Sequence, residues 1–134
     1  PVLFNNIYKG ALGEQIGKFI FETHFKVELE ELPLEHYELF DYKVKDSDTY
    51  IDFKHWKENT QISFVEQERK IREKLKLVNG NKVFIINILS TESRNPIKSS
   101  DGKIIQIPCL WNIEKQELES DFLKALKENE ILQN

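Results

Sequence analysis

Two aspartates and a lysine stand at spacings that a β-hairpin would bring together. Ten residues separate Asp41 from the tripeptide Asp52-Phe53-Lys54, and aromatic and β-branched residues favour strands on both sides of that gap. The run Asp46-Ser47-Asp48-Thr49 within the gap is rich in turn formers. The sequence therefore predicts strands over His36–Lys45 and Thr49–Trp56, joined as an antiparallel hairpin.

A turn at Asp46–Thr49 sets the predicted register of this hairpin. For a four-residue or a two-residue loop alike, Asp41 lies opposite Lys54, and Lys43 lies opposite Asp52. Side chains alternate along a strand, so all four share one face. Directly opposed Cβ atoms are about 4.5–5.5 Å apart and diagonal ones about 7–8 Å. Asp41, Asp52 and Lys54 are therefore predicted to converge.

Paired carboxylates beside an ammonium group suit the hydrolysis of a phosphodiester. Close carboxylates repel, and burying them without compensation is costly. A hard cation such as Mg²⁺ takes oxygen ligands at about 2.0–2.1 Å and keeps several waters. Such an ion polarises a phosphoryl oxygen and lowers the pKa of a bound water. The lysine can orient the attacking water and offset charge that develops on the phosphorus oxygens.

The simpler interpretation is a solvated face of the hairpin, in which Lys54 pairs across to Asp41. The tripeptide alone is a weak signal, because Asp41-Tyr42-Lys43 and Asp101-Gly102-Lys103 have the same form. An acid on the upstream helix and the order of the surrounding elements favour the catalytic interpretation.

The surrounding patterns predict an α/β domain with a mixed central β-sheet flanked by helices, in the order αββαββα. Helices are expected over Ile7–Phe25, Ile62–Val78 and Glu117–Leu132. Beyond the hairpin, strands are expected over Val83–Leu89 and Ile104–Trp111, with Thr91–Lys103 as a polar loop between them.

The first predicted helix combines an apolar stripe with several glycines. The stripe consists of Leu12, Ile16, Phe19 and Thr23. Gly10, Gly13 and Gly17 lower the helix propensity of the segment. We expect a close approach to another element as the compensation for these glycines.

Asp41, Asp52-Phe53-Lys54 and the helices around them resemble the PD-(D/E)XK nuclease superfamily, which has a restriction-endonuclease-like core. The shared order is a helix bearing an acid, a strand bearing Asp, a strand bearing Asp-x-Lys, and a helix. The resemblance extends from about Lys9 to Leu89. It departs at the residue before Asp41, which is Phe40 here and proline in the motif that names the superfamily. It implies a mixed sheet between helices and cleavage of DNA that depends on Mg²⁺ or Mn²⁺.

The resemblance also implies roles for the residues of the hairpin. Asp41, Asp52 and the backbone carbonyl of Phe53 correspond to metal ligands. Lys54 corresponds to the catalytic lysine.

Two helix residues complete the set that the resemblance implies. RecB-like nucleases and archaeal Holliday-junction resolvases use an acid of the first helix, for which Glu14 is the counterpart; a surface glutamate is the alternative. RecB-like members also use a glutamine of the helix after the Asp-x-Lys strand. Gln67 matches that position, and capping of a backbone group is its alternative role.

Charge is unevenly distributed along the chain. The net charge of −4 argues against a protein that coats nucleic acid by bulk attraction. Basic residues nevertheless gather between Lys54 and Lys82, where Lys57 and Lys70 are candidates for phosphate contacts. Glutamates are interleaved with them, so a solvated helix face with pairing between neighbouring turns is the alternative.

Length and composition predict one intracellular domain. The 134 residues match a single domain spanning 1–134, and one cysteine rules out an intramolecular disulfide. A cytoplasmic location is the simplest expectation, with no membrane contact, because the sequence has neither a long apolar run nor a secretory signal. The chain opens at Pro1 without any methionine, so we expect a piece of a longer protein.

The residues predict a hydrolase of phosphodiesters, and the resemblance implies that it cuts DNA with Mg²⁺ or Mn²⁺. Two alternatives remain: a member of the same fold that cleaves RNA or resolves DNA junctions, and a non-catalytic binding or scaffolding module. Because the domain is small, we expect attached domains or homodimer formation to direct it; by analogy with the superfamily, a helicase is one such domain.

Overall fold

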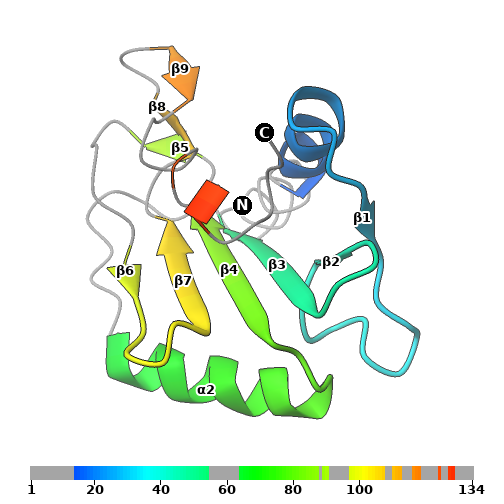
Figure 1. Ribbon diagram of the computed structural model, residues 1–134, viewed down its shortest axis with the longest axis vertical. Helices are drawn as coiled ribbons and strands as arrows, with labels where there is room; N and C mark the ends of the chain where they lie inside the picture. Colours follow the sequence, from blue (N-terminus) through cyan, green and yellow to red (C-terminus); the bar gives the residue numbers. More distant parts are fainter. Residues whose placement is uncertain are drawn as a thin grey trace, which may run out of the picture.

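The computed structural model describes residues 14–54, 64–87, 89–90, 97–107, 110–112, 116–118, 124 and 127–128. The chain folds as a mixed α/β structure around a six-stranded sheet in the order β1-β2-β3-β4-β7-β6 (Figure 1). These strands are β1 (Leu29–Glu30), β2 (Tyr42–Val44), β3 (Thr49–Lys54), β4 (Lys82–Asn87), β7 (Ile104–Ile107) and β6 (Ile97–Lys98). The expected α/β class with a mixed central sheet is confirmed.

Three parallel strands form the centre of the sheet. β3 pairs with β4 and β4 with β7 in parallel, whereas β1, β2 and β6 add antiparallel edges. Residues 83–87 of β4 are all buried, as expected for a strand covered on both faces. Its bounds lie close to the predicted Val83–Leu89.

The first helix packs on one face of the sheet. It is α-helical over residues 14–19 and continues as a π-helix, η1 (Ile20–His24). Gly17 is buried, and a Cβ atom at this position would overlap the ring of Phe53. The close approach expected from the glycines is therefore confirmed at Gly17.

The buried side of this helix differs from the predicted stripe. Phe19 is 61% exposed and Thr23 is also exposed, whereas Gly17 and Phe21 face the core. Contact through Gly17 decides which side meets the sheet. Ile16 of the predicted stripe and Phe21 do pack against the core, whereas Gly17 has no side chain and so gives no hydrophobic signal.

Helix α2 (Phe64–Leu77) packs on the opposite face, near the ends where the parallel strands begin (Figure 1). Ile71 and Leu75 contact a cluster that includes Val83 and Ile104. Asn79 and Gly80 end the helix, close to the predicted Val78, and Gly80 N–H donates to the Leu75 carbonyl at 2.9 Å.

The predicted strand over His36–Lys45 is wrong in its first half. Residues 34–39 form turns, in which His36 N–H donates to the Pro33 carbonyl and Leu39 N–H donates to the His36 carbonyl. Both of these hydrogen bonds are local, and strand pairing begins only at Tyr42. The second predicted strand, Thr49–Trp56, is confirmed as far as Lys54, and its last two residues lie outside the described ranges.

The second half of the chain contains more strands than predicted. The expected loop Thr91–Lys103 includes β6, which pairs with β7 through a tight turn at Ser99–Gly102. The predicted strand to Trp111 ends at Ile107. Trp111 instead starts β8 of a second sheet, ordered β5-β8-β9, with β5 at Leu89–Ser90, β8 at Trp111–Asn112 and β9 at Glu117–Leu118.

The predicted C-terminal helix is wrong at its start, because Glu117 and Leu118 pair with β8 as a strand. Gln116, at the turn before them, adopts a positive φ of 53°. Residues 124, 127 and 128 are helical, and the rest of the predicted helix lies outside the described residues.

Within the described ranges, no helix combines the length and apolar character needed to cross a membrane.

Candidate functional site

The β2–β3 hairpin brings the two predicted aspartates together with a register that differs from the prediction. Tyr42 pairs with Ile51 and Lys43 with Tyr50, which shifts the ladder by two residues. The loop occupies residues 45–48, one position earlier than expected. A shift of two leaves every side chain on its predicted face. Extended by one residue, the ladder sets Asp41 opposite Asp52 instead of Lys54.

The loop shift has a local cause at Asp46. This residue adopts a left-handed conformation with φ of 60°, which aspartate tolerates better than most residues. Ser47 closes the loop, because its hydroxyl donates to the Val44 carbonyl at 2.8 Å and accepts from Thr49 N–H at 3.2 Å. These bonds place the loop one residue earlier in the sequence than the turn-forming residues alone indicated.

Reciprocal hydrogen bonds hold Asp41 and Asp52 in place. Phe53 N–H donates to Oδ2 of Asp41 at 2.8 Å, and Asp41 N–H donates to Oδ1 of Asp52 at 3.2 Å. The Asp41 side chain thus accepts a hydrogen bond that a backbone carbonyl would accept in a continued ladder, one residue before β2 begins. Each acid is oriented by the main chain of the opposite strand.

Lys54 neutralises one of the two acids. Its Nζ lies 2.7 Å from Oδ2 of Asp52. The Asp52 side chain is almost fully buried, whereas the lysine side chain is 38% exposed. The ammonium group therefore bridges a buried carboxylate and the surface.

Glu14 joins this group from the first helix. Burial, the charge of Asp52 and a hydrogen bond to Glu14 raise the pKa of Asp41 to about 8, although the Phe53 N–H acts in the opposite direction. At neutral pH the Asp41 carboxyl therefore carries a proton that it can donate to Glu14. The β2–β3 hairpin and the first helix, which are separate in sequence, thus meet at the protonated Asp41.

Lys18 connects the first helix to β2. Its Nζ lies 5.4 Å from the ring centroid of Tyr42, within the range of a cation–π contact. Lys18 follows Glu14 by one helical turn, so both side chains lie on the same side of the helix. This contact holds the helix over the residue that directly follows Asp41.

The remaining predicted residues are not gathered at the acids. Gln67 is half-buried and Lys70 is exposed on α2, which begins on the β6–β7 side of the sheet (Figure 1). Arg72, further along the helix, ion-pairs with Asp101 in the β6–β7 turn. Lys57 lies outside the described residues.

Two buried polar residues near the site were not anticipated. Asn87 and Gln106 are 7% and 5% exposed, on β4 and β7. Their signal in the sequence is the interruption of two apolar runs, Val83–Leu89 and Ile104–Trp111. Central parallel strands are usually continuous apolar runs, so these positions stand out.

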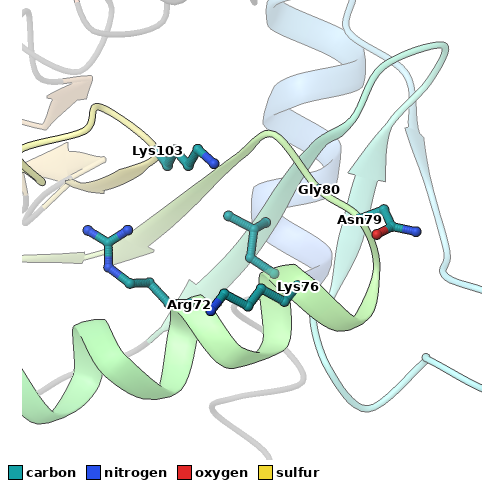
Figure 2. A pocket seen from close by; sticks show the side chains of 6 residues that line it. Arg72, Lys76, Asn79, Gly80 and Lys103 are labelled. Carbon is teal, nitrogen blue, oxygen red and sulfur yellow. The ribbon is translucent and has the colours of Figure 1, made fainter.

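A hollow of about 370 Å³ lies beside the C-terminal half of α2 and the turn that follows it (Figure 2). Its lining consists of Arg72, Leu75, Lys76, Asn79, Gly80 and Lys103. The positive charge there is partly neutralised, because Arg72 also pairs with Glu68 at 3.0 Å and with Asp101. The hollow is separate from the acids, since its residues come from the end of α2 and the start of β7.

The acids supply oxygen ligands that suit a hard cation, but they are not arranged around a common point. Across the described part of the chain, no group of three or more His, Cys, Asp or Glu side chains is placed to hold a metal ion. In this arrangement Asp52 is turned to Lys54, and Asp41 is hydrogen-bonded to Glu14. The carboxylates would have to exchange these partners in order to converge on one cation.

No protein-family model matches the sequence, and no curated protein matches it. The function is therefore inferred from the residues and their geometry.

Proposed function

We propose that this chain is a metal-dependent nuclease domain that cleaves DNA and has a restriction-endonuclease-like core. The observation that carries the proposal is the meeting of Asp41, Asp52 and Lys54, with Glu14 hydrogen-bonded to Asp41. The order of helix, antiparallel hairpin, helix and parallel strand supports it.

Glu14, Asp41 and Asp52 are the side chains that would hold Mg²⁺ or Mn²⁺. The N–H and C=O groups of one strand residue point to the same neighbour. Since Phe53 N–H reaches Asp41, the Phe53 carbonyl also faces the acids and can serve as a further ligand. The bound ion would supply polarisation of a phosphoryl oxygen and acidification of a water.

The crowding of negative charge also favours a cation at this position. Asp41 takes up a proton at neutral pH because it is buried beside Asp52. Binding of a divalent cation requires this proton to leave, and the charge of the cation makes the loss favourable. The site is therefore suited to exchange a proton for a metal.

Lys54 is assigned the role of orienting the attacking water and stabilising charge on the phosphate. Its ammonium lies at the surface side of Asp52, where a phosphate group can approach it. Asp52 holds the ammonium by a direct ion pair, so the lysine is positioned before substrate binds. Such a preorganised donor is effective where negative charge develops.

Cleavage of labelled single- and double-stranded DNA, and of RNA, with Mg²⁺, Mn²⁺ or EDTA tests the proposal. We expect metal-dependent cutting of DNA by the wild type and loss of cutting in Asp52→Asn and Lys54→Ala. Lys43→Ala is the matched control, because Lys43 lies on the same hairpin but bonds to the Ser47 carbonyl. Absence of cutting with every metal and substrate would contradict a nuclease function, and cutting of RNA alone would replace DNA as the substrate.

A further inference from the structure

The sheet face that carries Asp52 changes from apolar to polar toward the carboxyl ends of β3, β4 and β7. Tyr50, Val83 and Ile104 form one row across the three parallel strands. The next row on the same face consists of Asp52, Ile85 and Gln106. The row after that pairs Lys54 with Asn87.

Gln106 is the unexplained member of this polar region. The residue is 5% exposed, and its Nε2 is buried without a hydrogen-bond partner among the described residues. An unsatisfied buried donor destabilises a fold, so an apolar residue of similar size would suit a purely structural position better. A polar group kept at such a cost favours a partner from outside the chain.

The location of Gln106 indicates what that partner would be. In open α/β sheets, ligands bind beyond the carboxyl ends of the parallel strands. Neighbouring strands are about 4.7–4.9 Å apart, so two spacings place Gln106 roughly 10 Å from Asp52 along the row. A ligand that contacts both must extend across three strands, which a nucleic-acid strand can do.

We propose that Gln106 is a substrate-positioning residue whose amide donates a hydrogen bond to an oxygen of the nucleic-acid strand, next to the phosphate held at Asp41 and Asp52. This inference rests on the proposed nuclease function and extends the site from β3 across to β7. Asn87 lies opposite Lys54 in the next row toward the carboxyl ends and adds a further buried polar side chain to this face.

The test compares Gln106→Leu and Gln106→Glu with the wild type in thermal unfolding, DNA binding and cleavage kinetics. Leucine has a similar size and removes the orphaned donor, so its melting temperature should equal or exceed that of the wild type. Its KM for DNA should rise about tenfold, the loss expected for one hydrogen bond to a charged group, with a smaller change in kcat. Gln106→Glu should bind DNA still more weakly, because its carboxylate repels phosphate.

Two results would overturn the assignment of Gln106. A Gln106→Leu protein of unchanged KM would mean that the amide does not reach the substrate. A clearly less stable Gln106→Leu protein would mean that the amide is used within the fold. Failure of the nuclease proposal is distinguishable from both, because the wild type would then neither bind nor cut nucleic acid, while the melting temperatures would still report on the amide.

Discussion

The two halves of the sheet face that meets α2 have opposite character. Near the strand starts, Val83 and Ile104 are completely covered and pack with Leu75 of the helix. One row further toward the carboxyl ends, β3 and β7 carry Asp52 and Gln106 on that face, on either side of Ile85 of β4, although both polar residues are as deeply buried as the core. Depth of burial alone therefore does not determine composition in this sheet.

The difference lies in what compensates burial in each half. Apolar side chains under α2 gain about 25 cal/mol per Å² of surface removed from water. Asp52 depends on Lys54 and on the Asp41 N–H, and Asp41 retains a proton near neutral pH. The apolar half stabilises the fold, whereas the polar half is maintained at a cost in stability that a catalytic role would explain.

Asp52→Asn should separate these two contributions most strongly. Cleavage is expected to fall by at least about 100-fold, as for loss of a central electrostatic group. The melting temperature in EDTA near pH 8 should rise, because the like charge beside Asp41 is removed. Initial rates and thermal unfolding measure the two effects. A variant that is both active and less stable would show that the acid is structural.

Leu75→Ala should produce the reverse behaviour. The substitution removes a buried side chain from the apolar half, with an expected loss of about 2–5 kcal/mol in the free energy of unfolding. Urea denaturation measures this loss. Cleavage per folded molecule should stay within about twofold of the wild type, since α2 crosses the sheet away from the acids. A larger drop in cleavage would show that packing in the apolar half affects the acids.

Gly17→Ala tests how the first helix delivers Glu14. The added methyl group would overlap the ring of Phe53, so the helix must shift away from the sheet. Overpacking of this kind costs about 1–3 kcal/mol. Because Phe53 and Glu14 both contact Asp41, cleavage should also fall. Gln15→Ala, at an exposed position of the same helix, is the control. Equal stability and equal cleavage of the Gly17→Ala and Gln15→Ala variants would contradict the close packing.

Raising the pH should gradually lower the free energy of unfolding of the metal-free protein. Asp41 has a pKa of about 8 in the folded chain, against an ordinary value of 3.8. The folded state therefore keeps a proton that the unfolded chain releases. This stability is fully present below about pH 4 and is lost as the pH rises through about 8.

The slope from this one group is at most about 1.4 kcal/mol per pH unit. Urea midpoints in EDTA between about pH 5 and pH 8 measure it, and Asp41→Asn should flatten the dependence. A wild-type profile that is already flat would argue against a buried, crowded Asp41.

Several elements were predictable because their signals are local. The β2–β3 hairpin and α2 follow from strand alternation, helical periodicity and the Asn79-Gly80 stop. The hairpin register was wrong by two residues, since only the backbone conformation of Asp46 and the bonds of Ser47 place the loop. The shared face of Asp41 and Asp52 survived this error, because alternation has a period of two.

The sequence by itself determined which residues could do chemistry and that the hairpin would bring Asp41, Asp52 and Lys54 to one face. Only the tertiary structure decided that Glu14 reaches Asp41, because the close packing of Gly17 on Phe53 sets how near the first helix lies to the hairpin. It likewise decided that Gln106 shares a row with Asp52, since strand order and parallel register are set by pairing between distant segments.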